Sequence, residues 1–449
     1  MMLDAVTLTV AAALAQAPPP AEPQHAPPQK PEADESPQSI LPPETPSLGV
    51  QPSAALDFTP AIAEARQGLA DAGIVFNLNL TLDSGWNFTG GATAGGFVSG
   101  LVTATAQLDM EKLVKLKGGS FLVSWQDFFT TNPGAYDRVP DYWGYESIDS
   151  ALGNINQLSQ CYYSQSLLDG ALVVSFGKQD ALNSFLNPLG ATGYFISNMD
   201  CYPATMIPYT PTYPDQAMGL VIVGKPADWL ELKTAWFDGS NAYPAGGIPP
   251  PSTGSLGPGT FFDNPGSWFF LNEIDVSWKC DGGLDGSASI GGWWQSGQTS
   301  VFVPNGPAVP RISDGTGGLY AQVTQRIYNP DPTAQTARGV RLFAQFGWGD
   351  PSSNPANWSL AGGFAWDGPL PGRDADSFGI AAGYAGLSSD PGVYQSQTGL
   401  YNLNVEAYYA IALTDWMTLQ PDLQIIVSPE GSSEIPVAVV GMLRASINF

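Results

Sequence analysis

The chain has a single histidine in 449 residues, His25, and it lies in a proline-rich stretch near the N-terminus. Ser-His-Asp and Cys-His nucleophile systems need a histidine in the folded part of a protein, and most zinc sites use one as well. The scarcity of histidine therefore argues against those catalytic and metal centres. We expect no enzyme activity, no bound metal and no cofactor.

Cysteine is also scarce. The chain contains Cys161, Cys201 and Cys280, and no CxxC or other metal-ligand spacing relates them. Three cysteines are too few for a disulfide framework. Cys161 and Cys201 could pair in an oxidising compartment and leave Cys280 free, or all three could be free thiols. The spacing alone leaves both arrangements open.

Basic residues are few relative to acidic ones: 16 Lys and Arg stand against 41 Asp and Glu, which gives a net charge of −25 at pH 7. Nucleic-acid binding requires a basic surface, so we expect no nucleic-acid partner. The acidity can belong to a solvated exterior or to a vestibule that attracts cations. Charged residues make up only 13% of the chain, well below the usual fraction of about 25% in soluble proteins.

Long hydrophobic runs are missing too. No stretch of 18 consecutive apolar residues occurs, so the sequence offers no transmembrane helix. A closed β-barrel is the other structure that satisfies every backbone group within lipid. The 51 glycines, 40 prolines and 11% aromatic residues fit a protein of many strands and turns with aromatic girdles.

The N-terminal part divides by composition into three segments. Residues 1–17 resemble a secretory signal, although no Lys or Arg precedes the apolar run; the alternative is a disordered apolar tail. Residues 18–56 are dominated by Pro, Glu, Gln, Ser and Ala and predict a disordered linker. Residues 57–73 predict a short periplasmic helix, with Pro60 at its first position and Gly73 just past its end.

Alternation with a period of two dominates the rest of the chain. In the final stretch, 437–449, one parity is apolar and the other carries Arg444, Ser446 and Asn448. This pattern is typical of a strand with one apolar and one wet face. Long segments of this kind predict strands at approximately 73–84, 98–109, 119–129, 154–166, 170–179, 216–225, 229–238, 268–279, 284–295, 318–328, 338–349, 357–367, 376–387, 401–413, 416–428 and 436–449.

The connections between these segments alternate in length. Short turns such as 168–170 and 280–283 interleave with long connections at roughly 130–153, 180–215, 239–267 and 296–317. Long loops on one side, short turns on the other and an even strand number are typical of outer-membrane barrels. We therefore predict an all-β fold: a 16-stranded antiparallel outer-membrane β-barrel over residues 74–449 with a short N-terminal helix.

Several separated blocks carry a family resemblance. They are Arg66–Ile74, Leu108–Leu113, Leu168–Gln179, Tyr213-Pro214 with Met218-Gly219, Trp236–Gly239, Leu419–Gln424 and Gly441–Arg444. In this order and spacing the chain resembles the carbohydrate-selective porins of the OprB type over roughly residues 60–449. The resemblance implies an outer-membrane barrel that passes monosaccharides through a constriction narrowed by inward-folded loops. The proline-rich extension and the acidic balance depart from the family pattern.

Strand parity nominates side chains that face the lumen, where polar groups can exchange hydrogen bonds with a sugar as it sheds water. The candidates are Tyr320, Gln322, Thr324, Arg326, Arg341, Gln345, Glu273, Asp275, Lys279, Glu406 and Arg444. We expect the arginines to narrow the pore and to be held by acids such as Glu273 and Glu406. Each inward arginine could instead be an ordinary partner of a neighbouring acid.

The third long connection, about 180–215, is unusually aromatic and includes Tyr194 and Phe195. If the first strand rises from the periplasm, this is the third outward loop, which commonly folds into porin lumens. Its aromatic rings could cover the apolar faces of a pyranose. Packing of the loop against the inner wall would explain the same rings without any sugar contact.

These observations predict a porin of the bacterial outer membrane, embedded in lipid, that allows passive diffusion of small sugars and ions. One alternative is a general or cation-leaning diffusion porin; another is a secreted soluble all-β glycan-binding protein. Glu273 and Asp275 could also mimic a glycosidase carboxylate pair, although two lumen-facing acids explain them more simply. The sequence makes no prediction of oligomeric state.

Overall fold

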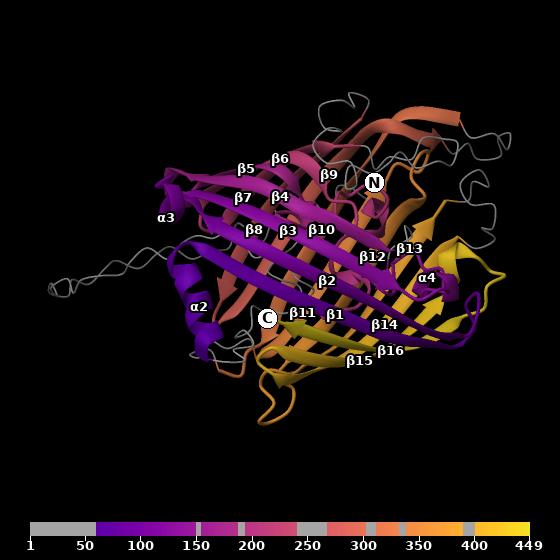
Figure 1. Ribbon diagram of the computed structural model, residues 1–449. Helices are drawn as coiled ribbons and strands as arrows, with labels where there is room; N and C mark the ends of the chain where they lie inside the picture. The colour runs from indigo at the N-terminus through magenta and orange to yellow at the C-terminus, as the bar shows by residue number, and fades with distance from the viewer. Residues whose placement is uncertain are drawn as a thin grey trace. The chain divides into compact units, whose positions relative to one another are not determined.

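Sixteen antiparallel strands close into one barrel in the computed structural model, which describes residues 60–149, 154–186, 194–239, 267–301, 311–331, 338–388 and 400–449. The strands follow one another round the barrel in chain order, and β1 meets β16 (Figure 1). The predicted signal-like segment and linker, residues 1–17 and 18–56, lie outside the described residues. The predicted fold class is confirmed.

The strand bounds agree closely with the alternation in the sequence. They are β1 Ile74–Thr89, β2 Gly95–Asp109, β3 Gly119–Thr130, β4 Ile155–Leu167, β5 Leu172–Gln179, β6 Ala217–Ala227, β7 Leu230–Asp238, β8 Trp268–Cys280, β9 Leu284–Val301, β10 Arg311–Tyr328, β11 Gly339–Gly349, β12 Ala356–Asp367, β13 Ser377–Leu387, β14 Tyr401–Thr414, β15 Met417–Val427 and β16 Ala438–Asn448. The largest differences are at β1, β9 and β10, which run further than predicted. Both parities of 296–300 and 313–317 are polar or glycine, so the alternation fades there while the backbone pairing continues.

The C-terminal strand closes the barrel, as its pattern predicts. Leu80 lies opposite Ile447 and Asp83 opposite Arg444 in the β1–β16 register. The Phe449 backbone N–H donates to the Leu78 carbonyl at 2.8 Å, so the pairing extends to the last residue. Closure leaves no open sheet edge.

The outer face of the barrel is apolar and carries exposed aromatic rings. Trp236, Phe270 and Trp294 form one outward row across β7, β8 and β9, and all three are more than one-third exposed. A neighbouring outward row pairs Leu232 with Ile274, and both side chains are exposed. An apolar band bounded by aromatic rings matches the lipid-facing surface of an outer-membrane barrel. No helix among the described residues is long and apolar enough to cross a membrane.

The two ends of the barrel differ. The short-turn end carries α2 (Pro60–Asp71), α3 (Met110–Val114) and the 3-10 turn η1 (Leu168–Gly170) (Figure 1). The long-loop end carries α4 (Ala135–Arg138), η2 (Ala181–Asn183), η3 (Asn198–Asp200), η4 (Ala204–Met206) and η5 (Pro429–Gly431). The helix predicted before the first strand is present as α2.

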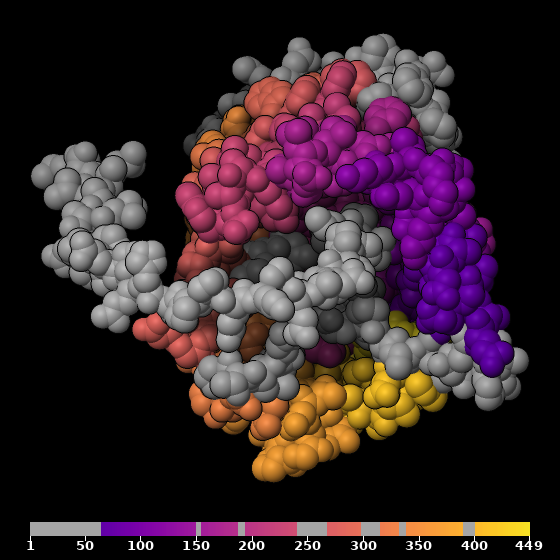
Figure 2. All heavy atoms as spheres, turned by 90° about the vertical axis from the view of Figure 1, so that its left-hand side faces the viewer, coloured from indigo at the N-terminus to yellow at the C-terminus, as the bar shows by residue number. Residues whose placement is uncertain are grey.

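Two loops of the long-loop end fold into the barrel. We call them the 131–149 loop, between β3 and β4, and the 180–216 loop, between β5 and β6, of which 180–186 and 194–216 are described. The 180–216 loop buries Phe185, Leu186 and Met206 against wall residues such as Phe237 and Phe269. The lumen is therefore narrowed by two ordered segments. Figure 2 looks onto the short-turn end, where the strands ring a hollow.

Candidate functional site in the lumen

Two buried carboxylates of the barrel wall hold the 180–216 loop. Glu273 on β8 accepts hydrogen bonds from the Leu186 backbone N–H at 3.0 Å and the Tyr320 hydroxyl at 2.8 Å. Glu406 on β14 accepts from the Ile196 N–H at 2.5 Å and from the N–H and hydroxyl of Ser197. Each carboxylate thus satisfies backbone donors of a loop that has no sheet partner of its own.

This geometry corrects one expectation. The sequence predicted that Glu273 and Glu406 hold arginine side chains across the channel, but neither acid has an arginine partner among the contacts above. Glu273 is paired with Lys233, whose Nζ lies 3.0 Å from its Oε1. Parity gives the face that a side chain takes, but it does not reveal which loop covers that face.

The predicted lumen glutamines also serve the loop. Gln322 Nε2 donates to the Cys201 carbonyl at 3.0 Å, and Gln345 Nε2 donates to the Met199 carbonyl. Both glutamines are nearly inaccessible, and so are Tyr320 and Thr324. All four face the lumen as predicted, and the loop covers Tyr320, Gln322 and Gln345. They therefore fix the inner wall of the passage and do not form its water-exposed surface.

Tyr194 and Phe195 pack against the far wall. The Phe195 ring lies edge-on to Tyr408 with a centroid distance of 4.9 Å and lies 5.6 Å from Phe343. Tyr194 lies 5.8 Å from Tyr408 and is only partly buried. Packing accounts for Phe195, which is 3% exposed, whereas the Tyr194 ring keeps accessible surface.

Four charged side chains form a rung across four neighbouring strands. Arg326 and Arg341 are register partners on β10 and β11. Arg326 Nε lies 2.7 Å from Asp285 on β9, and Arg341 Nη2 lies 2.9 Å from Asp367 on β12. Two adjacent guanidinium groups repel each other. The acids on the two flanking strands, Asp285 on β9 and Asp367 on β12, offset this repulsion.

The charged rung remains in contact with solvent. The side chains of Arg326 and Arg341 are 12% and 19% exposed, and those of Asp285 and Asp367 are 32% and 10% exposed. Both arginines therefore lie on the lumen wall as predicted, paired with neighbouring-strand acids. Asp285 and Asp367 were missed because their pairing depends on the strand register, which the sequence does not display.

A second charged group surrounds Lys233 on β7. Its ammonium contacts Glu273 and Asp275 and lies 3.8 Å from Glu231. Lys279, on the same strand face as Asp275, is exposed near the short-turn end. Glu273 and Asp275 share one lysine, and Glu273 is fully covered. The Glu273 carboxylate is already occupied by Lys233, the Leu186 N–H and the Tyr320 hydroxyl, which does not favour a glycosidase role.

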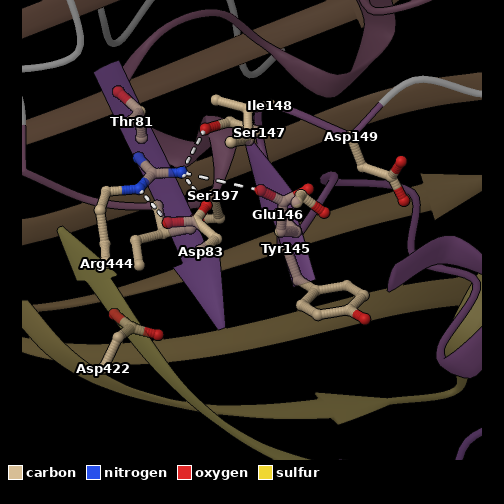
Figure 3. A network of polar contacts seen from close by, with 12 residues as sticks. Thr81, Asp83, Tyr145, Glu146, Ser147, Ile148, Asp149, Ser197, Asp422 and Arg444 are labelled. Carbon is tan, nitrogen blue, oxygen red and sulfur yellow. Dashed lines mark hydrogen bonds and ion pairs between the residues drawn. The ribbon is translucent and has the colours of Figure 1, made fainter. Parts of the chain in front are cut away.

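Arg444 is buried beneath the 131–149 loop (Figure 3). Its Nε and Nη2 donate to the two carboxylate oxygens of Asp83 at 2.8 and 2.6 Å. Its Nη2 also lies 3.5 Å from the Ser147 hydroxyl and 3.9 Å from Glu146. The side chain of Arg444 is 5% exposed. It faces inward as predicted, but it joins the closing seam to the loop and does not border open water.

Burial perturbs the acids of the inward loops. Burial and the neighbouring Asp83 carboxylate raise the pKa of Glu146 well above its ordinary range. Burial raises the pKa of Asp141 to about 6, although hydrogen bonds from Asn402 and Asn404 oppose the increase. Burial likewise raises the pKa of Asp180 to about 6. Asp180 is the N-cap residue of η2, and its side chain accepts a hydrogen bond from the Leu182 N–H at 2.9 Å.

We expect Asp141→Asn to stabilise the protein at neutral pH. Because burial in the folded protein raises the pKa of Asp141, folding of the 131–149 loop favours the protonated form of this acid. The protonated acid contributes fully to the stability of the folded state below its ordinary pKa near 4. This contribution is lost as pH rises through about 6. A neutral Asn removes this loss, which is on the order of 1–3 kcal/mol. The buried Oδ1 atoms of Asn402 and Asn404, which have no hydrogen-bond partner in the described part of the chain, can accept the new amide protons.

The measurement is the thermal unfolding midpoint in detergent between pH 4.5 and 7.5. Asp141→Asn should raise the midpoint at pH 7.5 and flatten its dependence on pH. Asp281→Asn, in an exposed turn, is the control and should track the wild type. A lowered midpoint at pH 7.5 would show that the ionised Asp141 stabilises the loop.

Cys161, Cys201 and Cys280 are all free thiols, so the second of the two arrangements left open by the sequence holds. Within the described residues, no group of three or more His, Cys, Asp or Glu side chains is arranged to hold a metal ion.

Comparison with known proteins places this barrel. The family model described as "Carbohydrate-selective porin, OprB family" matches residues 96–449. The chain belongs to this family. It is a carbohydrate-preferring diffusion porin of the bacterial outer membrane, and members of the OprB family are channels rather than enzymes.

Individual relatives agree with the OprB assignment. Porin B of Pseudomonas aeruginosa is 23% identical over 350 residues, which cover 70% of this chain and 72% of that protein. The high-pH structure of Pseudomonas putida OprB superposes with a TM-score of 0.75 at 20% identity, covering 88% of this chain and 99% of that one. The low-pH structure of the same protein gives a TM-score of 0.56 at 17% identity. At these identities the two structures establish the fold.

Proposed function

We propose that this chain passes small neutral sugars, monosaccharides above all, through the passage left beside the two inward loops, and that it catalyses no reaction. The observation that carries the proposal is the rung Asp285–Arg326–Arg341–Asp367, whose two arginines and Asp285 keep contact with solvent. We further propose that the short-turn end faces the periplasm, which is the usual orientation of outer-membrane barrels.

The rung suits a polyhydroxylated solute. Guanidinium groups offer several N–H donors and carboxylates offer acceptors, so a sugar that sheds water finds both kinds of partner along one wall. Each charge is already paired, so the rung acts mainly through hydrogen bonds and exerts little net attraction on ions. The partly accessible ring of Tyr194 adds an apolar face to the inner wall.

The arrangement of the loops supports a narrow passage. Glu273 and Glu406 attach the 180–216 loop to β8 and β14, two separate regions of the wall. Gln322 and Gln345 attach it between them, on β10 and β11. A segment fixed at several points keeps one position while solute passes, so the width of the passage is set by the folded structure.

A cation-leaning pore is the second candidate, favoured by the net charge of −25. The two candidate functions predict different responses of the ion current to added sugars and to a salt gradient. A sugar pathway predicts that monosaccharides reduce the ion current by occupying the passage. A cation pathway predicts strong selectivity in a salt gradient with little effect of sugars.

Arg341→Ala tests the proposal. Removing the guanidinium should raise single-channel conductance and weaken the block by glucose several-fold, because both bulk and donors leave the passage. Asp367 then loses its partner, so the reversal potential in a salt gradient should shift toward cations. Arg373→Ala, which breaks an ion pair with Asp376 in the turn before β13, is the matched control. If Arg341→Ala leaves conductance, sugar block and reversal potential unchanged, the rung does not border the passage.

A further inference from the structure

Exposed lysines are concentrated at the short-turn end of the barrel. Of the eight lysines in the chain, five, Lys112, Lys115, Lys117, Lys225 and Lys279, lie in or next to the turns of this end and are exposed. Lys178 and Lys233 are buried in the barrel. Exposed acids such as Glu111, Asp169, Asp228 and Asp281 lie in the same turns, so any positive charge at this end is local to single turns.

Apolar side chains are exposed beside three of these lysines. Val114 and Leu116, in and after α3, are 61% and 45% exposed, and Leu168 in η1 is 75% exposed. The two turns are joined, because the Ser166 N–H donates to the Gly118 carbonyl at 2.7 Å. We call Val114, Leu116, Leu168, Lys115 and Lys117 the rim patch.

The segment that carries the rim patch is held in place. Asp109 caps α3 by accepting from the N–H groups of Glu111 and Lys112 at 2.9 and 3.1 Å. Lys112 Nζ donates to the Ala70 carbonyl of α2 at 3.1 Å, and Lys115 ends α3 with φ of 65°. Four members of the rim patch are therefore exposed on a segment whose backbone is held in one position: Val114, Lys115, Leu116 and Lys117.

The local charges leave two ammonium groups available. Asp109 and Glu111 accept from backbone N–H groups of the same turn. Within the described residues, the ammonium groups of Lys115 and Lys117 have no hydrogen-bond or ion-pair partner, and Asp169 in η1 is an exposed acid next to Leu168 in the sequence. The rim patch therefore offers unpaired positive charge next to exposed apolar surface.

The rim patch continues the lipid-facing surface. One outward row of the neighbouring strands pairs Ile74 with Leu108, Leu108 with Phe121, Phe121 with Tyr163 and Tyr163 with Phe176. Leu108 and Phe121 lie close to the turn that contains α3, and the outward pair Leu167–Leu172 of β4 and β5 lies directly before η1. A membrane that contacts the row reaches its headgroup region at the level of the turns.

We propose that the rim patch binds anionic phospholipid headgroups of the leaflet at the short-turn end. Val114, Leu116 and Leu168 enter the boundary between headgroups and acyl chains, while Lys115 and Lys117 bind lipid phosphates. Lysine stems lie along apolar surface while their ammonium groups stay in the polar layer. Basic residues next to apolar ones are the feature by which interfacial segments recognise anionic lipid.

Native mass spectrometry of the full-length channel tests the inference. The detergent-solubilised protein is mixed with phosphatidylglycerol or with phosphatidylcholine of the same acyl chains, and the fraction that retains one lipid is measured. The wild type should retain phosphatidylglycerol about 25-fold better, because each of the two lysines near an anionic headgroup contributes about fivefold. Lys115→Gln with Lys117→Gln should reduce this preference to about twofold or less.

Two controls separate the components of the patch. Lys225→Gln removes a lysine of the same end that is paired with Glu231 at 2.7 Å, and it should keep the wild-type preference. Val114→Ser with Leu168→Ser should weaken retention of both lipids alike. All variants should keep the wild-type sugar block, so failure of this inference and failure of the proposed sugar pathway are distinguishable.

The inference is overturned if the double lysine variant retains phosphatidylglycerol as the wild type does. It is also overturned if Lys225→Gln loses the preference equally, which would indicate a diffuse charge effect. Displacement of the lipid by millimolar glycerol phosphate would overturn it as well, because the site would then recognise a soluble phosphate.

Discussion

Replacing Arg444 by methionine should lower the free energy of unfolding by about 3–5 kcal/mol, the usual cost of removing one partner of a buried ion pair. The methionine leaves the fully covered Asp83 carboxylate without its two guanidinium hydrogen bonds. It also removes the nearest positive charge from Glu146 in the 131–149 loop. The damage falls on the β1–β16 seam, where the chain closes on itself.

Unfolding of the purified channel in urea, followed by its heat- and denaturant-dependent gel mobility, measures this effect. Arg373→Met is the matched control: the Arg373 side chain is 42% exposed, and Asp376 keeps the hydrogen bonds from the Tyr409 hydroxyl and the Ala412 N–H, so the loss should be clearly smaller. Combining Arg444→Met with Asp83→Leu should recover much of the loss, since an apolar pair leaves no buried charge. An Arg444→Met channel as stable as the wild type would mean that the seam does not depend on this pair.

Replacing Glu406 by alanine should convert the narrow passage into a wider one. The change removes the acceptor of the Ile196 and Ser197 N–H groups and of the Ser197 hydroxyl. The middle of the 180–216 loop then loses its attachment to β14 while Glu273 still holds Leu186. We expect single-channel conductance to rise several-fold and glucose block to fall about tenfold, because the passage no longer fits the solute.

Single-channel recording in planar bilayers measures both quantities. Glu430→Ala is the matched control, since Glu430 accepts from the Tyr136 hydroxyl at the exposed long-loop end. It should leave conductance and block near wild-type values. If Glu406→Ala conducts and is blocked like the wild type, the 180–216 loop does not set the width of the passage.

The strands and the facing of their side chains followed from the sequence. Alternation in 401–413 places Glu406 and Tyr408 inward, and the structure has both there. A one-residue error in parity would have reversed every assignment along a strand. The inward placement of Arg326, Arg341 and Arg444 was likewise predicted, because a charged side chain on the lipid face is costly.

The partners of those arginines did not follow from the sequence. Arg326 meets Asp285 and Arg444 meets Asp83 only because of the register between neighbouring strands. Alternation fixes the face of a residue but not its height relative to the next strand. A register assignment for β1 against β16 would have placed Asp83 opposite Arg444.

The inward loops were the least predictable part. Aromatic residues at 180–215 suggested a packed loop, but a loop has no period from which its contacts can be derived. Gln322 and Gln345 therefore appeared to be free donors for sugar, whereas they are occupied by the Cys201 and Met199 carbonyls. The side chains that keep contact with solvent include Arg326, Arg341 and Asp285.

The central claim, a sugar passage whose width is set by the anchored 180–216 loop, is tested most directly by osmotic swelling of liposomes that contain the purified channel. The measurement compares glucose, a disaccharide, a trisaccharide and a zwitterionic amino acid for the wild type and Glu406→Ala. The account predicts that the wild type admits glucose faster than the amino acid and nearly excludes the trisaccharide, and that Glu406→Ala admits all four. A wild type that does not distinguish glucose from the amino acid, together with an unchanged size limit in the variant, would contradict it.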